Sequence, residues 1–296
     1  MRAERLTPYA RLPRAYRDLT LLHSTVDAFG RAHWLLRERE SAEQASGPYD
    51  AMVVTVADDG FHETRLSSVL PRFPRIDSLP DGGFVLADGR CREGDDQVQV
   101  FDALGRPTWT FQVGDAIEHL LTDESGDLWV GYFDEGIFGD DPLSAAGVRR
   151  WSSTGEPLWT YSPPPGADWI SDCYALNVDG RTAWVYPYTQ FALLEVCGDD
   201  PPRVRTTSVQ GARGVAVHGE RGAFLGGYRK DGDRLVMASL TDTSVETVST
   251  TRLARPDGSP LDDRRHVVSR GPRLYVREQR RTDWAVWDIS EHDGWT

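Results

Sequence analysis

The feature that most constrains this chain is a repeated unit in which a tight turn leads into a short strand centred on a large aromatic residue. The aromatics of successive units lie 40 to 55 residues apart, with a mean of about 48. They are Trp34, Phe84, Trp129, Trp184, Phe224 and Tyr275. Six such units account for nearly all of the 296 residues. A period of this length indicates that one supersecondary unit is repeated in space.

The residues between these aromatics indicate that the chain is all-β. Asp-Gly pairs, a strong hairpin signal, stand at positions 59–60, 81–82, 179–180 and 231–232. Alternating apolar residues flank turns at Gly105 and Gly155, where we expect a positive φ. Amphipathic helical spacing never persists for more than two turns. We therefore predict a single six-bladed β-propeller of four-stranded antiparallel blades.

One domain over residues 1–296 is expected. Blades are predicted at about residues 17–70, 74–114, 117–163, 170–209, 212–254 and 264–290, with a closing strand at 4–12. The Leu-Pro-Arg segment at 12–14 repeats at 70–72, which gives the N-terminus the outer strand of a blade. The last unit has only three clear strands. The N-terminal strand is thus expected to pair beside residues 284–289 and close the ring, which removes exposed sheet edges.

Two stretches resemble known propeller repeats. Residues 117–136 carry Gly-x-x-Trp-x-Gly around Trp129 before a glycine-rich turn, and they resemble the blade repeat of two-component-regulator sensor propellers. The Gly-x-x-x-Trp hairpins that end at Trp109 and Trp159 resemble PQQ-type propeller repeats with their docking tryptophans. These resemblances imply the fold and the way blades pack. They transfer no active-site residue, and no cofactor is expected, PQQ included.

The charge balance of the chain limits the classes of molecule that it is expected to bind. With 46 acidic and 33 basic residues the formal net charge is −13, which argues against nucleic acid and anionic membranes as partners. No apolar run approaches the roughly 18 residues of a membrane span, and the N-terminus has no apolar segment typical of a signal peptide. Cys91, Cys173 and Cys197 are odd in number and far apart, which suits a reducing compartment. We expect a cytoplasmic protein.

Arginines in the predicted loops between blades are the first candidates for a binding site. They are Arg14, Arg17, Arg72, Arg75, Arg213 and Arg264. The duplicated Leu-Pro-Arg-x-x-Arg crossings would bring four of them to one side of the channel mouth. Guanidinium forks there would bind carboxylate or phosphate. The alternative is that these arginines pair with carboxylates of the adjacent blade.

Aromatic residues outside the repeat are the second candidates. Trp169, Tyr188, Tyr228 and Tyr132 fall in or beside predicted loops, where they would line a pocket or form a protein-contact surface. The six periodic aromatics are instead expected in the core.

A third set of residues would suit an enzyme. His119 and His266 are each expected to begin an inner strand, where a histidine can act as a general base. Asp134 and Glu135 follow the strongest blade motif and would serve as an acid–base pair or as oxygen ligands. The alternatives are structural histidines and a solvated turn. No metal site is predicted, because the zinc and calcium signatures are missing, as are Walker A and G-x-S-x-G.

The sequence therefore favours a non-catalytic recognition module that binds a partner protein or a small anionic ligand on the channel-mouth face. The alternative is a channel-site enzyme, a lyase, hydrolase or cyclase, that acts on a small metabolite.

Overall fold

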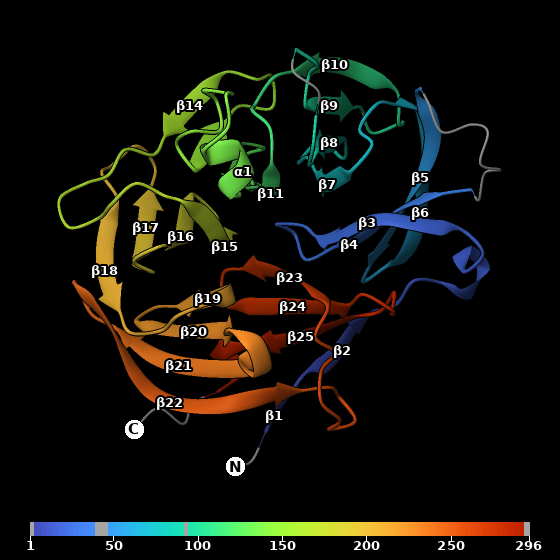
Figure 1. The fold of residues 1–296 in the computed structure, drawn as a ribbon. Helices are drawn as coiled ribbons and strands as arrows, with labels where there is room; N and C mark the ends of the chain where they lie inside the picture. Colours follow the sequence, from blue (N-terminus) through green and yellow to red (C-terminus); the bar gives the residue numbers. More distant parts are fainter. Residues whose placement is uncertain (1–2, 39–46, 92–93, 293–296) are drawn as a thin grey trace. The chain divides into compact units, whose positions relative to one another are not determined.

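The regular secondary structure of the chain is almost entirely β-strand (Figure 1). The computed structural model describes residues 3–38, 47–91 and 94–292. Within these ranges it has 25 strands and one α-helix of four residues, α1 (Asp134–Ile137). The all-β prediction is confirmed. No helix in the described ranges combines the length and apolarity needed to cross a bilayer.

The chain divides into two compact units. The N-terminal unit is Leu12–Tyr161, and the C-terminal unit joins Met1–Arg11 to Ser162–Thr296. The expectation of one domain stays a prediction.

The N-terminal unit contains three four-stranded antiparallel sheets, each made of consecutive strands. The strands are β3 (Thr20–Val26), β4 (Ala32–Arg37), β5 (Tyr49–Ala57) and β6 (Gly60–Val69); β7 (Pro74–Ser78), β8 (Phe84–Asp88), β9 (Val98–Phe101) and β10 (Pro107–Phe111); and β11 (Ile117–Thr122), β12 (Leu128–Tyr132), β13 (Val148–Trp151) and β14 (Pro157–Thr160).

The C-terminal unit repeats this pattern, with three runs of four antiparallel strands that further bridges join into one sheet. The strands are β15 (Asp172–Asp179), β16 (Thr182–Tyr188), β17 (Leu193–Cys197) and β18 (Arg203–Thr207); β19 (Ala212–His218), β20 (Arg221–Gly226), β21 (Arg234–Leu240) and β22 (Ser244–Ala254); and β23 (Arg265–Arg270), β24 (Arg273–Glu278), β25 (Trp284–Asp288) and β2 (Thr7–Ala10). The short strand β1 (Glu4–Arg5) pairs in parallel with β22.

The N-terminal strand completes the last of these runs. β2 pairs antiparallel with β25, with Thr7 opposite Val286 and Ala10 opposite Trp284. The expected pairing beside residues 284–289 is therefore observed. The count of six blades and the closure of a ring stay predictions.

Turn chemistry explains why these hairpins form where they do. The Asp102 carboxylate accepts the backbone N–H groups of Leu104 and Arg106, and Gly105 adopts a φ of 76° between them. The predicted Asp-Gly hairpins at 59–60, 81–82 and 179–180 are confirmed. Asp231-Gly232 also lies in a hairpin connection, between β20 and β21, but this loop is longer and contains a 3₁₀ helix, η3 (Arg229–Asp231), after which Gly232 has a φ of −57°.

The six periodic aromatics lie on the second strand of each run of four. Five of them are buried, and Trp184 on β16 is partly buried against the same core as Phe224. The prediction that these residues form the core is confirmed. In the N-terminal unit the indole N–H of Trp109 donates to the Ser153 carbonyl in a turn of the next sheet, 3.0 Å away.

Asn177, the single asparagine of the chain, ties together the first strands of the three runs in the C-terminal unit. Its Nδ2 donates to the carbonyls of Val215 on β19 and of Gly271 after β23, both at 2.8 Å. Its Oδ1 accepts the Gly271 N–H at 2.7 Å. The Asn177 side chain is fully buried, and both its amide oxygen and its amide nitrogen form hydrogen bonds within the protein.

Candidate functional site

Aromatic side chains gather at one end of β15 and β16 in the C-terminal unit. The rings of Tyr174 and Tyr188 stack with centroids 5.5 Å apart and an interplanar angle of 15°. Phe191 meets both edge-on, at 5.5 and 5.6 Å. Tyr228, from the loop between β20 and β21, lies 6.5 Å from Tyr174. These four residues form what we call the tyrosine cluster.

The backbone around the tyrosine cluster is held in uncommon conformations. Phe191 and Arg229 have positive φ values of 58° and 56°, which non-glycine residues adopt only where the surrounding structure imposes them. At Gly211, with a φ of 74°, an added Cβ would lie 3.1 Å from the Tyr228 ring. The loops therefore fix the rings in place.

Arg213 adds a cation to the tyrosine cluster. Its guanidinium carbon lies 3.6 Å from the centre of the Tyr174 ring, a close cation–π contact. Burial, followed by the hydrogen bond with Tyr228, raises the pKa of Tyr174 to about 12, against a smaller lowering by Arg213. The Tyr174 hydroxyl is thus protonated at neutral pH and can donate a hydrogen bond.

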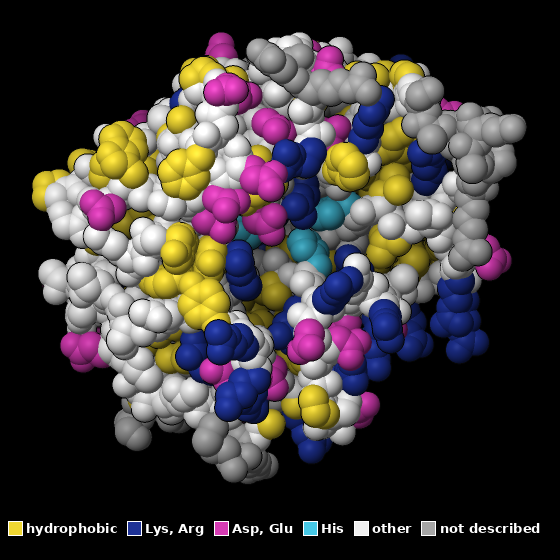
Figure 2. Space-filling view, in the orientation of Figure 1, with side chains coloured by type: hydrophobic (Ala, Val, Ile, Leu, Met, Phe, Trp, Pro, Cys, Tyr) yellow, Lys and Arg dark blue, Asp and Glu magenta, His cyan; other side chains and the backbone are white. Residues whose placement is uncertain are grey.

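Part of the tyrosine cluster faces solvent. Tyr188 is 38% exposed and Tyr228 is 47% exposed, whereas Phe191 is buried beneath them. Figure 2 shows hydrophobic side chains over this end of β15 and β16, with basic side chains along part of their border. An exposed apolar surface with a cation at its edge suits recognition of another molecule.

Of the residues predicted from the sequence, the structure brings Arg213, Tyr188 and Tyr228 together. Trp169 lies in the preceding loop and is 64% exposed. Tyr174 was missed, although its place next to Cys173 after a Pro/Gly-rich loop was visible in the sequence.

Tyr132 is the last residue of β12, beside a loop as expected, but it does not form a contact surface. It is fully buried on β12, and its hydroxyl donates to the Val113 carbonyl. The phenol side chain fits the core because its one polar atom has a partner there.

Two predicted arginines meet at a pocket in the N-terminal unit. The pocket has a volume of about 490 Å³, and its lining includes His23, Arg72, Phe73, Arg75, Arg90 and Phe133. Arg75 pairs with Glu118 of the neighbouring sheet at 3.2 Å, and Arg90 pairs with Glu135 and Asp115. Two of the three guanidinium groups are thus already neutralised.

The other predicted arginines lie elsewhere. Arg14 and Arg17 are exposed at the 3₁₀ helix η1 (Arg14–Tyr16) and do not line that pocket. Arg264 is exposed before β23 in the C-terminal unit, where its carbonyl accepts the Gln279 N–H. Among the described residues, Arg14, Arg17, Arg72 and Arg264 make no ion pair.

The residues proposed for catalysis are divided between the two units. His119 is on β11 and His266 on β23, in different units. Glu135 is held by Arg90, and the Asp134 carboxylate accepts the N–H of Glu135 at 2.9 Å. Within the described ranges, no three or more His, Cys, Asp or Glu residues lie together as a metal site would require.

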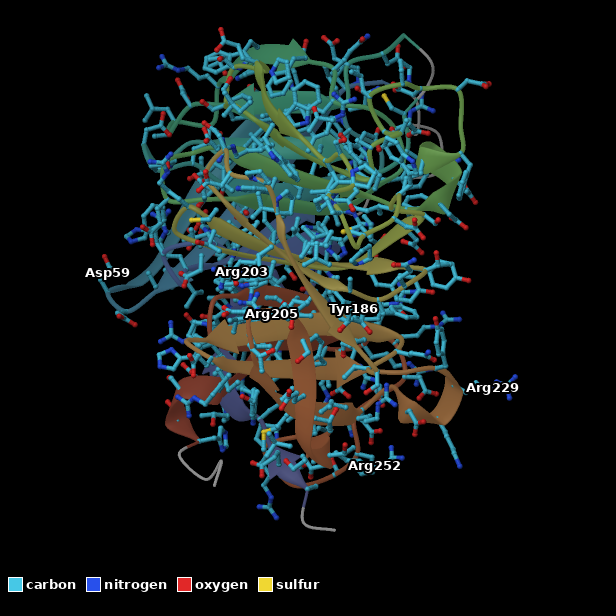
Figure 3. The ribbon with its side chains drawn as sticks, turned by 90° about the vertical axis from the view of Figure 1, so that its left-hand side faces the viewer. Asp59, Tyr186, Arg203, Arg205, Arg229 and Arg252 are labelled. Carbon is cyan, nitrogen blue, oxygen red and sulfur yellow. The ribbon has the colours of Figure 1, made fainter. Side chains whose placement is uncertain are left out.

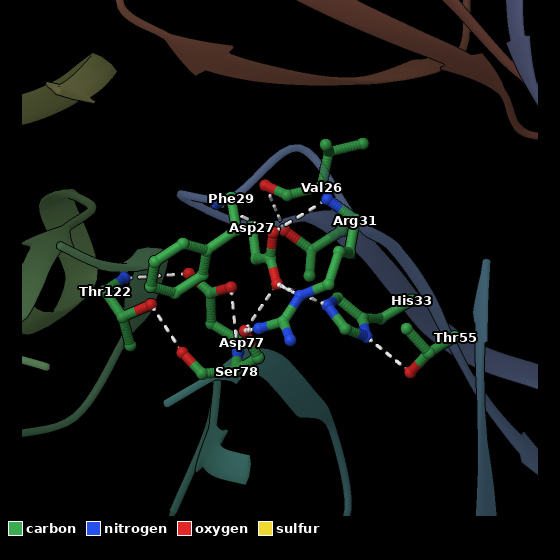
Figure 4. Close-up of polar contacts among 10 residues, drawn as sticks. Val26, Asp27, Phe29, Arg31, His33, Thr55, Asp77, Ser78 and Thr122 are labelled. Atoms are coloured by element: carbon green, nitrogen blue, oxygen red, sulfur yellow. Dashed lines mark hydrogen bonds and ion pairs between the residues drawn. The ribbon is translucent and has the colours of Figure 1, made fainter. Parts of the chain in front are cut away.

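A buried network that the sequence did not reveal centres on Asp27 (Figure 4). Its Oδ2 accepts hydrogen bonds from Arg31 Nε at 2.7 Å, His33 Nε2 at 2.8 Å and Ser78 Oγ at 2.6 Å. The other His33 nitrogen, Nδ1, lies 2.8 Å from Thr55 Oγ1. Serine and histidine both bond to the aspartate rather than to each other, so this is not the order of a hydrolytic triad. The network is buried and links neighbouring sheets.

Comparisons with known proteins bear on the fold. No family model matches the chain, and no curated protein matches its sequence. Among solved structures, Hsv2 from Kluyveromyces lactis aligns with a TM-score of 0.53 at 8% identity, over 92% of this chain and 75% of that one. KlHsv2 with loop 6CD replaced by a Gly-Ser linker aligns with a TM-score of 0.52 at 7% identity, over 93% of this chain and 79% of that one.

These neighbours are propellers. The structure supports a β-propeller fold for this chain. PQQ-bound aldose sugar dehydrogenase from Streptomyces coelicolor is also found, with a TM-score of 0.44 at 13% identity over 92% of this chain and 97% of that one. At such identities a likeness bears on the fold alone, and the function of this propeller has to be argued from its own residues.

Proposed function

We propose that this propeller is a non-catalytic recognition module that binds a partner protein through the tyrosine cluster. The observation that carries the proposal is the Arg213–Tyr174–Tyr188 arrangement, in which a guanidinium and two rings pack together with an exposed ring at the surface. Tyrosine, tryptophan and arginine dominate the energetics of protein interfaces, because they bury large areas and keep a polar end.

Two further features support recognition by a largely preformed surface. The positive φ values at Phe191 and Arg229 and the close approach of Gly211 to Tyr228 restrict the rings before any partner arrives. Rings that are already ordered lose little conformational entropy on binding.

We also propose a cytoplasmic location and exclude polyanions as partners. A net charge of −13 disfavours polyanions, so nucleic acid and anionic membranes are not proposed as partners. The cysteine pattern supports a cytoplasmic location.

The proposal is tested by retaining partners from an extract of the source cells on the immobilised protein, with quantification by mass spectrometry. The wild type is compared with Tyr188→Ala and Tyr228→Ala, and with Phe138→Ala as a control that removes an aromatic with 73% exposure from the N-terminal unit. We expect one set of proteins to be kept by the wild type and the control and to be lost from both tyrosine variants. Equal retention by all four would refute the proposal.

A small anionic ligand is the second candidate, favoured by the pocket of about 490 Å³ at Arg72. Arg72 is the one of its three arginines that has no ion pair within the described residues. Calorimetric titration with inorganic phosphate tests this candidate, since binding should be lost in Arg72→Gln. Binding that persists in that variant would contradict it. The channel-site enzyme with His119, His266, Asp134 and Glu135 stays an alternative prediction.

A further inference from the structure

The edge of the tyrosine cluster carries basic side chains that have no acidic partner. Arg229 and Lys230 directly follow Tyr228 in η3, and Arg213 contacts Tyr174. In the part of the chain that the structure describes, none of these three cations forms an ion pair. Figure 3 shows Arg229 extending from the short helix away from the ribbon.

Nearby acidic groups are partly neutralised by the protein itself. Asp231 and Asp233, which flank Gly232, both pair with Arg252, the former at 3.2 Å. The basic groups of η3 are exposed beside the rings, while the acidic groups nearest the cluster are Asp172, whose charge acts on Tyr174, and Asp168, which accepts a hydrogen bond from Gln190. In a chain with a net charge of −13, a local basic edge stands out from the average surface.

A fourth basic side chain near the cluster, Arg234, forms its hydrogen bonds within the protein and stabilises the loop. Arg234 donates to the carbonyls of Gly226 at 3.2 Å and Gln210 at 2.6 Å, so its guanidinium is used within the C-terminal unit. Arg213, Arg229 and Lys230 are therefore the cations that remain for a partner.

We propose that the tyrosine cluster takes an acidic peptide segment, in which an aromatic side chain packs on Tyr188 and Tyr228 and flanking carboxylates meet Arg213, Arg229 and Lys230. This inference rests on the proposed function and specifies its partner. Charge complementarity selects the segment and speeds the encounter, and the rings supply the apolar contact.

The inference is tested with defined peptides. The probe is a capped, fluorescently labelled peptide of alternating glutamate and phenylalanine. It is compared with peptides in which glutamine or lysine replaces every glutamate, and with one in which serine replaces every phenylalanine. Binding is followed by fluorescence anisotropy in about 0.1 M and about 1 M salt, between which the Debye length falls from about 10 to about 3 Å.

We expect the glutamate–phenylalanine peptide to bind most tightly and to weaken at high salt. The double variant Arg229→Gln/Lys230→Gln should bind it about tenfold more weakly. The matched control Arg14→Gln/Arg17→Gln removes the same charge from exposed arginines of the N-terminal unit and should bind as the wild type does.

Lys230 also offers a direct positional readout, because it is the single lysine of the chain. A carbodiimide forms a direct amide bond between a carboxylate and an amine, so a peptide held beside Lys230 couples faster than one that meets it by diffusion. We expect the capped acidic peptide to be coupled at Lys230, and this coupling to fall in Tyr188→Ala, which keeps the lysine but removes a ring of the site.

The outcomes separate this inference from the proposed function. If the glutamine or lysine peptide binds as tightly and Tyr188→Ala still abolishes binding, the acidic partner is wrong while recognition by the cluster stands. If the serine peptide binds equally and Tyr188→Ala has no effect, the cluster is not the site and both are wrong. No binding of the acidic aromatic peptide at about 1 mM also overturns the inference.

Discussion

Asn177→Ala removes the amide that joins three strands of the C-terminal unit, and its effect can be worked out bond by bond. The Gly271 carbonyl keeps a second donor, the Val217 N–H at 2.9 Å, so it is not left unsatisfied. The Gly271 N–H loses its acceptor, and an unsatisfied buried donor costs about 1–3 kcal/mol. The two lost bonds from Nδ2 add roughly 1 kcal/mol each.

The expected loss is about 3–5 kcal/mol of unfolding free energy, which lowers Tm by roughly 6–20 °C in a chain of this size. Urea and thermal unfolding followed by tryptophan fluorescence would measure it. Gln112→Ala, at an exposed site of the N-terminal unit, serves as a control and should change stability by less than about 0.5 kcal/mol.

The pH dependence of stability in the variant Asn177→Asp tests the same hydrogen bonds. A carboxylate there would face two carbonyl oxygens at 2.8 Å, so the folded state favours the protonated form and the pKa of the introduced group rises above its unfolded value of about 3.9. Stability of this variant is therefore highest in acid and falls as the pH rises above about 4. If Asn177→Ala unfolds with the control, or if Asn177→Asp shows no such fall, the three bonds do not hold the strands as argued.

Three further substitutions test other parts of the fold. Burial would raise the pKa of Asp27, but the hydrogen bonds from His33 and Ser78 and the charge of Arg31 hold this pKa well below the usual 3.8. The ionised carboxylate therefore stabilises the folded state above about pH 4, and this stabilisation is lost in acid. Asp27→Asn should thus cost roughly 2–3 kcal/mol at pH 7 in urea unfolding, and a gap to wild type that does not narrow by about pH 3 would contradict this. Gly211→Ala should cost about 1–2 kcal/mol in the same assay and displace the Tyr228 ring, which weakens peptide binding; an unchanged affinity would show that the ring position is not critical. Arg205→Gln removes the partner of Glu195 at 2.7 Å (Figure 3 labels Arg205), with an expected loss of about 2 kcal/mol by thermal unfolding, and no loss would mean that the pair is dispensable.

The periodic aromatics show which part of the fold could be predicted from sequence. Trp34 and Phe224 lie far apart in the chain but occupy the same position of their run of four strands. Because each run buries one large ring on its second strand, the spacing of the rings reports the spacing of the sheets. Turns can also be predicted from the sequence where their hydrogen bonds are local, as at Asp102, whose carboxylate accepts the backbone N–H of Leu104 in its own turn.

The candidate binding surface was less predictable because tertiary contacts form it. Tyr174 and Tyr228 meet through a strand end and a loop that are more than fifty residues apart. The Asp231-Gly232 signal marked the β20–β21 connection, but not its longer form, in which a 3₁₀ turn precedes Gly232 and Asp231 pairs with Arg252. The sequence placed three members of the site near loops but could not assign them to one surface.

The pairing of β2 with β25 has a consequence for biosynthesis. The ribosome makes β2 first, but the strand against which it pairs emerges near the end of synthesis. Until β25 has been made, β2 has no strand to pair with, and the C-terminal unit cannot complete its last run of four strands. The N-terminal unit already has all of its strands by then. A circular permutant that carries residues 3–11 behind His292, which lies beside Glu4, would keep the buried Ile289 and place the two strands in tandem. We expect it to fold faster during translation, with the Thr7–Val286 register retained.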